Sequence, residues 1–136
     1  GETLRAAPLD AILVSELPRT RQTAELVNRY HGAPILVRPE LNDIRSGFEG
    51  RPVAGYFAAV GADRMNLRPP GGESLRDYQV RVLPVLDWLR ERPWTTVLIV
   101  AHEETLRVLV AALRGLPAER MLELNFGNCE ILEFQT

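Results

Sequence analysis

The sequence has a single cysteine, Cys129, so no disulfide can form within the chain. This cysteine and the two histidines, His31 and His102, match no metal-binding spacing, and we expect neither a metal nor another cofactor. An unpaired cysteine favours a reducing compartment. Apolar runs long enough to cross a bilayer are also absent, and no basic and apolar signal segment opens the chain, so we expect a cytoplasmic protein without membrane contact.

An excess of charge of either sign is missing as well. The 16 basic and 18 acidic residues leave a formal net charge of -2, which provides no general positive field to attract nucleic acid. Any recognition of an anion must therefore be local. With 136 residues, of which 46% are apolar, the chain has the size and composition of one globular domain, and we expect a single domain over residues 1–136.

The apolar run from Val97 to Ala101 predicts a strand that is buried on both faces, which is typical of a parallel sheet. The run ends at His102, and a helical pattern covers 105–113. In open α/β sheets this end of a strand is where ligands bind, because helix N-termini with unpaired N–H groups gather there. Taken alone, a single histidine in this position is more often a structural, hydrogen-bonded residue than a catalyst.

Two other segments repeat the same order of a short apolar strand followed by polar residues. A strand at 11–15 ends at Ser15, and a helix that begins with Pro18 carries Arg19 in its first turn. A strand at 35–37 leads to Asp43 and an irregular stretch up to residue 50. We therefore expect these polar side chains and His102 to meet at one edge of a parallel sheet.

The remaining segments complete the expected architecture. Ser74 and Asp77 have the spacing of a capping box that opens a helix, and Pro84 is expected to bend or split that helix. Alternating residues at 122–124 and 129–134 predict an antiparallel hairpin at the sheet edge. The sequence thus predicts an α/β fold, a three-layer sandwich with a mostly parallel central sheet, helices on both faces and an antiparallel C-terminal edge strand.

The polar residues at the expected edge suit one chemistry. Arginine offers a rigid fork of donors that matches two phosphate oxygens. A histidine beside a helix N-terminus can donate to a phosphoryl oxygen, and a carboxyl group can protonate a departing alkoxide. Arg19, His102 and Asp43 together therefore indicate phosphoryl transfer that needs no metal.

Four motifs in order carry a resemblance that spans nearly the whole chain. They are Ser15-Glu16-Leu17-Pro18-Arg19-Thr20-Arg21-Gln22-Thr23-Ala24, then Leu41-Asn42-Asp43-Ile44 with Gly47-Phe48-Glu49-Gly50, then Pro70-Gly71-Gly72-Glu73-Ser74, and last Val100-Ala101-His102-Glu103-Glu104-Thr105-Leu106-Arg107. In these motifs the chain resembles the histidine phosphatase superfamily, also called the phosphoglycerate mutase-like family.

The resemblance implies roles for several residues. Arg19 would hold the phosphoryl group, His102 would be the second histidine of the pocket, and Ser15 and Glu103 would add contacts to the phosphate. Asp43 takes the position of the general acid, where the family usually has glutamate. Because aspartate is one methylene shorter, Glu103 or Glu49 is an alternative donor. Glu103 also departs from the glycine that commonly follows the second histidine.

The nucleophile of this family is a histidine in an Arg-His-Gly motif at the end of the first strand, and the chain contains no such motif. Residues 1–7 look like the end of a helix that begins earlier. We therefore expect a fragment of a complete phosphatase, whose first strand and nucleophilic histidine lie outside the 136 residues, so that the chain alone is inactive. The alternative is a non-catalytic member that binds phosphate or a partner.

The function expected of the complete protein is hydrolysis of a phosphate monoester through a phosphohistidine intermediate. Mutases of the family carry a longer segment between the acid and the glycine-rich turn, and the short distance in sequence from Asp43 to Gly71 favours hydrolysis. Phosphoglycerate mutase-type transfer is the alternative. The expected partner is a small phosphorylated substrate, with neither nucleic acid nor membrane, and a homodimer stays open.

Overall fold

The computed structural model describes residues 8–47, 50–61, 63–127 and 130–135. The chain forms two compact units, each made of two segments of sequence. The first unit comprises 1–43 and 85–102, and the second comprises 44–84 and 103–136. The expectation that 1–136 forms one domain stays a prediction.

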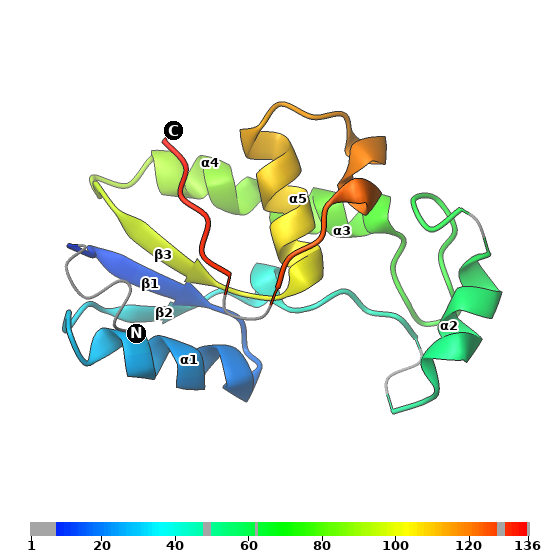
Figure 1. Ribbon diagram of the computed structural model, residues 1–136, viewed down its shortest axis with the longest axis horizontal. Helices are drawn as coiled ribbons and strands as arrows, with labels where there is room; N and C mark the ends of the chain where they lie inside the picture. The colour runs from blue at the N-terminus through cyan, green and yellow to red at the C-terminus, as the bar shows by residue number, and fades with distance from the viewer. Residues whose placement is uncertain (1–7, 48–49, 62, 128–129, 136) are drawn as a thin grey trace. The chain divides into compact units, whose positions relative to one another are not determined.

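A parallel sheet lies at the centre of the first unit (Figure 1). The strand order is β2-β1-β3, and Leu13 in the middle strand lies opposite Leu36 on one side and Ile99 on the other. The strands are β1 (Ala11–Val14), β2 (Ile35–Val37) and β3 (Val97–Val100). All three were expected from their short apolar runs, and their parallel pairing brings their carboxyl ends to the same edge.

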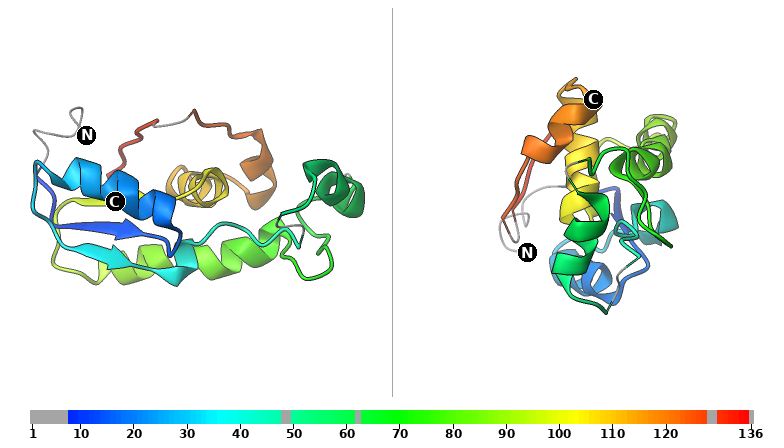
Figure 2. Two further views of the ribbon diagram at one scale, coloured as in Figure 1. Left: turned by 90° about the horizontal axis from the view of Figure 1, so that it is seen from below. Right: turned by 90° about the vertical axis from the view of Figure 1, so that its right-hand side faces the viewer.

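Helices cover both faces of this sheet (Figure 2, left). On one face, Ile12 and Val14 form a cluster with Ala24 of α1 (Pro18–Asn28). On the other face, Leu13 forms a cluster with residues of α4 (Pro84–Arg90). The four residues of β1 are completely buried because neighbouring strands pair with both of its edges and both faces are covered. The predicted α/β class with helices on both faces is confirmed.

β3 forms one edge of the described sheet, and it differs from β1 in burial. Its four residues are all partly exposed, although their composition is as apolar as that of β1. An edge strand leaves one row of backbone N–H and C=O groups without a neighbouring strand. That a further strand lies outside the 136 residues stays a prediction.

The second unit is built on helices. They are α2 (Val53–Val60), α3 (Leu75–Val82), α5 (Glu103–Leu113) and the 3-10 helix η3 (Ala118–Glu123). α5 packs against both α3 and η3. The hydroxyls of Tyr78 and Thr105 form a hydrogen bond of 2.5 Å, and neither residue is exposed to solvent. A buried polar contact therefore joins α3 to α5 in the second unit.

The capping box expected at the start of α3 is present. The backbone N–H of Asp77 donates to Oγ of Ser74 at 3.0 Å, and the backbone N–H of Ser74 donates to a carboxylate oxygen of Asp77 at 3.1 Å. Proline then splits the helical pattern into two helices, since α3 ends at Val82 and α4 begins at Pro84. Proline is tolerated in a first helical turn because its missing N–H would have no intrahelical partner there.

Two loops of the second unit approach each other backbone to backbone. Glu73 N–H donates to the carbonyl of Arg45 at 2.6 Å, and the Glu73 carboxylate accepts from Arg45 N–H at 3.0 Å. A Cβ on Gly47 would collide with the carbonyl oxygen of Pro70, and one on Gly72 would collide with that of Arg45. The two glycines therefore permit a contact that no larger residue allows.

The prediction of an antiparallel hairpin at the C-terminus is wrong for the described residues. Residues 122 and 123 belong to η3, and residues 130–135 have no regular secondary structure. The sequence of η3, Ala-Glu-Arg-Met-Leu-Glu, consists of strong helix formers, so local propensity overrides the short period-two pattern. Residues 128 and 129, and the helix end expected at residues 1–7, lie outside the described residues.

Candidate active site

The predicted convergence of polar residues takes place at the carboxyl edge of the sheet in the first unit. Ser15 directly follows β1, His102 comes two residues after β3, and Asp43 follows β2 and the 3-10 helix η2 (Pro39–Leu41). Hydrogen bonds among these residues and Arg19 of α1 join all three positions. The parallel order of the strands is what brings together residues that are 87 positions apart in the chain.

His102 is almost completely buried, with an exposed fraction of 7%. Its Nε2 lies 2.9 Å from Oγ of Ser15, and its Nδ1 lies 3.0 Å from Nη2 of Arg19. A guanidinium can only donate, so Nδ1 must accept, and the proton of the neutral ring must lie on Nε2. Nε2–H therefore donates to Ser15, and the lone pair of Nδ1 faces Arg19.

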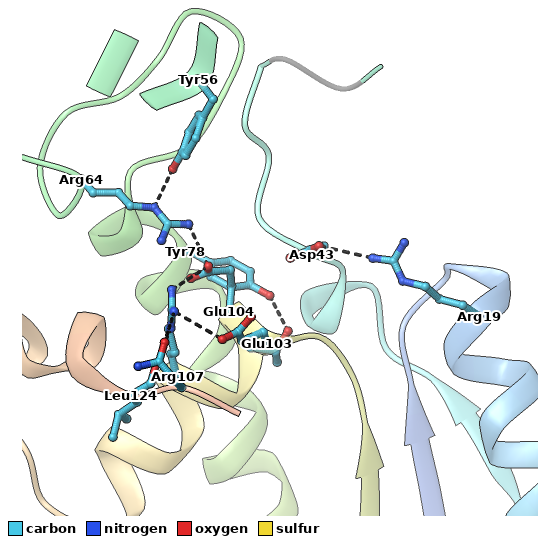
Figure 3. A network of polar contacts seen from close by, with 11 residues as sticks. Arg19, Asp43, Tyr56, Arg64, Tyr78, Glu103, Glu104, Arg107 and Leu124 are labelled. Atoms are coloured by element: carbon cyan, nitrogen blue, oxygen red, sulfur yellow. Dashed lines mark hydrogen bonds and ion pairs between the residues drawn. The ribbon is translucent and has the colours of Figure 1, made fainter. Parts of the chain in front are cut away.

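Arg19 connects His102 to Asp43. The same Nη2 that contacts His102 lies 3.3 Å from Oδ2 of Asp43 (Figure 3). The side chains of Arg19 and Asp43 are 65% and 38% exposed. An ion pair this open is worth about 1 kcal/mol or less, so an incoming anion can replace it at little cost. Glu49, the alternative acid, lies outside the described residues.

The hydroxyl of Ser15 points into the protein rather than toward Arg19. It is within hydrogen-bond distance of His102, of the N–H of Leu17 at 3.2 Å and of Oγ1 of Thr20 at 3.0 Å. A hydroxyl has one donor and two acceptor positions, and these three contacts use all of them. Ser15 thus holds the ring of His102, and the contact to phosphate expected of Ser15 stays a prediction.

Glu16 and Asn42, which the sequence did not single out, join the loop after β1 to the loop after β2. The side-chain amide of Asn42 accepts from Glu16 N–H at 2.7 Å and donates to the Glu16 carboxylate at 2.8 Å. Asn42 directly precedes Asp43, so this reciprocal pair fixes the backbone that carries the candidate acid. Neither residue lies in a periodic pattern, and only the spatial approach of the two loops gives them a role.

Burial is the largest influence on the pKa of His102 and lowers it below its ordinary value of 6.5. The negative charge of Asp43 acts in the opposite direction, and the positive charge of Arg19 lowers the pKa of His102 further. The neutral ring that the hydrogen bonds require is therefore also the form that its surroundings favour.

Glu103 belongs to the second unit, where it takes part in a network of charged side chains (Figure 3). Its carboxylate lies 3.4 Å from the guanidinium of Arg107. The neighbouring Glu104 accepts from Arg107 at 2.9 Å and from Arg64 at 2.8 Å through a single carboxylate oxygen. Glu103 is thus engaged with a cation of its own helix, and its contact to phosphate stays a prediction.

Within the described ranges, no three His, Cys, Asp or Glu side chains are grouped so that they could hold a metal ion. None of the helices in the same ranges is both long and apolar enough to pass through a membrane.

The sequence profile of the histidine phosphatase superfamily, branch 1, matches the chain over residues 1–136. The chain belongs to the histidine phosphatase superfamily. The resemblance inferred from the four motifs is thereby confirmed.

Relatives that are named for two different activities match the chain. It is 36% identical over 124 residues to "Adenosylcobalamin/alpha-ribazole phosphatase" of Salmonella typhimurium. This match covers 85% of this chain and 61% of that protein. It is 31% identical over 140 residues to "Probable phosphoglycerate mutase GpmB" of Erwinia tasmaniensis, which covers 96% of this chain and 65% of that protein. The chain therefore spans less than two thirds of the length of these curated relatives.

A solved structure supports the same family. The α-ribazole phosphatase from Shigella flexneri is 31% identical to the chain and superimposes with a TM-score of 0.77. The match covers 87% of this chain and 63% of that structure. The fold is therefore that of a histidine phosphatase.

Proposed function

We propose that the protein containing this chain hydrolyses phosphate monoesters of small molecules in the cytoplasm through a phosphohistidine intermediate. Arg19 and His102 hold the phosphoryl group, Asp43 is the general acid, and the nucleophilic histidine lies outside these 136 residues. The observation that carries the proposal is the contact of one arginine nitrogen with both a buried histidine and a carboxylate at the carboxyl edge of the sheet. The names of two phosphatase relatives support the reaction type.

The side chains of the site can stabilise the transition state without large rearrangement. Arg19 is exposed enough to turn its donors from His102 and Asp43 toward phosphoryl oxygens. Charge that develops on the equatorial oxygens then meets the guanidinium of Arg19 in its new orientation and the imidazole of His102, whose ring is held in position by Ser15. The reciprocal pair of Asn42 and Glu16 keeps the backbone before Asp43 in position while Arg19 moves.

The reaction proceeds in two displacements. In the first, the absent histidine attacks phosphorus, the bond from phosphorus to the ester oxygen breaks, and the carboxyl group of Asp43 transfers its proton to that oxygen. In the second, water attacks the phosphorus of the phosphohistidine and gives a proton to the Asp43 carboxylate, and the bond from phosphorus to nitrogen breaks. The cycle regenerates the histidine and the protonated acid, and it releases inorganic phosphate.

Mutase activity is the second candidate, since a relative carries the name of a phosphoglycerate mutase. A mutase must keep water away from the phosphohistidine until a second hydroxyl accepts the phosphoryl group. The segment from Asp43 to Gly71 is short in sequence, which supports a site that water can enter. We therefore favour hydrolysis.

The deciding experiment uses the longer protein that includes an Arg-His-Gly motif. Release of inorganic phosphate is measured with an α-ribazole phosphate, 3-phosphoglycerate, 2-phosphoglycerate and p-nitrophenyl phosphate, and isomerisation of the two phosphoglycerates is measured in parallel. We expect release of phosphate from at least one ester, and a phosphoenzyme that survives alkaline quench and is lost in acid. Isomerisation without net release would favour the mutase, and absence of any turnover despite phosphate binding would favour a non-catalytic binding protein.

A further inference from the structure

The hydroxyl groups behind His102 form a chain whose hydrogen-bond directions can all be assigned. Nε2–H of His102 donates to Ser15, as the contact of Arg19 with Nδ1 requires. Ser15 Oγ also accepts from the N–H of Leu17, so its own proton must point to Oγ1 of Thr20 at 3.0 Å. Thr20 in turn donates to the carbonyl of Leu17 at 2.9 Å. The carbonyl of Ser15 lies further from the same hydroxyl, at 3.3 Å, and in either case the chain runs from the ring toward the backbone.

The same atoms also permit the opposite direction. If Thr20 donates to Ser15 and Ser15 donates to Nε2, then Ser15 still makes two acceptor contacts and one donor contact. The carbonyl of Leu17 keeps a partner in this arrangement, because it also accepts from the backbone N–H of Thr20 at 3.2 Å. In both directions Ser15 Oγ keeps three hydrogen bonds and the carbonyl of Leu17 keeps a donor, so reversal costs only the 3.3 Å contact of Thr20 Oγ1 with the carbonyl of Ser15.

Because these hydroxyls are buried, only protein atoms determine the directions of their hydrogen bonds. Ser15 and Thr20 are exposed by only 1% and 2%, and His102 by 7%. Bulk solvent therefore offers no replacement partners behind the ring. On the other side of the ring, the partner of Nδ1 is an exposed arginine that can move away. The state of Nδ1 thus decides the direction of the whole chain.

We propose that Ser15 and Thr20 act as a reversible hydroxyl relay that lets neutral His102 change Nδ1 from an acceptor, when Arg19 contacts it, into a donor, when a phosphoryl oxygen does. A phosphoryl oxygen that carries no proton, as in a monoester dianion, only accepts, so it repels the lone pair that Nδ1 presents in the free protein. In the switch, the ring of His102 turns out toward solvent on the side that Arg19 leaves, gives up the proton of Nε2 there, takes one proton at Nδ1, and returns to its buried position. The hydroxyls of Ser15 and Thr20 rotate, and no covalent bond in them breaks.

This inference rests on the proposed function only in assuming that an anion reaches Nδ1. Ser15 and Thr20 are positioning residues, since they act through the ring of His102. The alternative way to bind a phosphoryl oxygen is uptake of a second proton to give the imidazolium. That path costs the electrostatic penalty of a buried cation next to Arg19, which the change of tautomer avoids.

The experiment measures the tautomer of His102 by NMR of the chain labelled with 15N in its two histidines, with His31→Gln to assign the signals. In the free protein we expect the proton on Nε2. Saturation with inorganic phosphate near neutral pH is expected to move it to Nδ1. Formation of the imidazolium on saturation, or a free protein with the proton on Nδ1, would overturn the relay.

A matched pair of variants tests the relay without any ligand. Thr20→Val removes the acceptor of the Ser15 proton with little change in shape, so this proton is driven toward Nε2 and the Nδ1–H tautomer is expected to gain population severalfold. Thr20→Ser keeps the hydroxyl and is expected to behave as the wild type. If both variants fold and give the wild-type tautomer, the relay is refuted. If phosphate does not bind at all, the proposed phosphoryl pocket fails, and the comparison of these variants still decides the relay.

Discussion

Nη2 of Arg19 lies 3.0 Å from Nδ1 of His102, so the side of the imidazole that faces the arginine carries a lone pair. The contact sets the protonation state of the ring and marks the position that a phosphoryl oxygen would take. It also ties the first turn of α1 to the residue that follows β3 by two positions. The candidate site is therefore defined by an interaction that ligand binding must break.

Replacement of Arg19 by lysine is expected to keep the charge and lose the planar fork of donors. Because one amine cannot contact two phosphoryl oxygens in fixed geometry, turnover of the longer protein should fall roughly 100-fold to 1,000-fold. The control is Arg21→Lys, which lies two residues further in α1 and pairs with Glu25 on the surface. Steady-state rates that fall equally in both variants would contradict the assignment of Arg19.

Asp43→Asn should slow esters with poor leaving groups by about 100-fold to 10,000-fold, because an amide cannot donate a proton to the departing oxygen. The loss should be much smaller with p-nitrophenyl phosphate, whose leaving group needs no protonation. Asp87→Asn, an exposed change on α4, serves as the control. Equal losses for both classes of ester would show that Asp43 is not the acid.

The lowered pKa of His102 predicts how stability depends on pH. The unfolded chain, with a histidine pKa near 6.5, binds a proton more readily than the folded protein does, so stability is full above pH 6.5 and declines as the pH falls below it. One proton limits the slope to about 1.4 kcal/mol per pH unit. Urea denaturation between pH 7.5 and 5.5 measures the decline, and His102→Gln should reduce it. A wild-type stability that rises over this interval would contradict the prediction.

Asp77 is expected to stay ionised to unusually low pH. The hydrogen bonds from Arg68 are the main cause, and together with the backbone N–H of Ser74 they hold the pKa of Asp77 at about 2. Titration of the side-chain carboxyl followed by 13C NMR gives this value directly. In Arg68→Ala the pKa should rise toward the ordinary 3.8, and an unchanged midpoint would show that the pair does not form in solution.

Gly47 and Gly50 allow a test of the contact between the two loops of the second unit. Their φ angles are almost equal, at +77° for Gly47 and +76° for Gly50. A Cβ on Gly47 would collide with Pro70, whereas one on Gly50 would meet open space. Gly50→Ala should cost about 1 kcal/mol for the left-handed backbone alone. Gly47→Ala should cost clearly more, because backbone atoms must also move apart. Thermal unfolding of the two variants gives the difference, and equal losses would argue against the close approach.

The sequence predicted the strands and their polar ends well because those signals are local. A short apolar run that stops at a histidine or a serine predicts the strand, and it also predicts that the polar side chain lies at the carboxyl edge of the sheet. Both predictions held for Ser15 and His102. The split at Pro84 and the capping box of Ser74 were predictable for the same reason, since each depends on residues within one turn.

Other parts of the site depend on contacts between distant segments and carry no local signal. Thr20 reads as an ordinary residue of the first turn of α1, and its place behind His102 follows only from the approach of the β1 and β3 ends. The same holds for the pair of Asn42 and Glu16. The prediction of a C-terminal hairpin was wrong because the alternation over residues 122–124 is a weaker signal than the helix propensity of the segment that forms η3.

The complete burial of β1 sets a limit on how this protein can evolve. Ile12 and Val14 fill the space beneath one helix while Leu13 fills the space beneath the other, so a change of volume at any of the three disturbs packing on a face that the neighbouring positions cannot repair. The loops at the carboxyl edge have no such constraint on their exposed residues. Diversification of substrate preference is therefore expected to accumulate in those loops, while Ile12, Leu13 and Val14 tolerate little beyond aliphatic exchange.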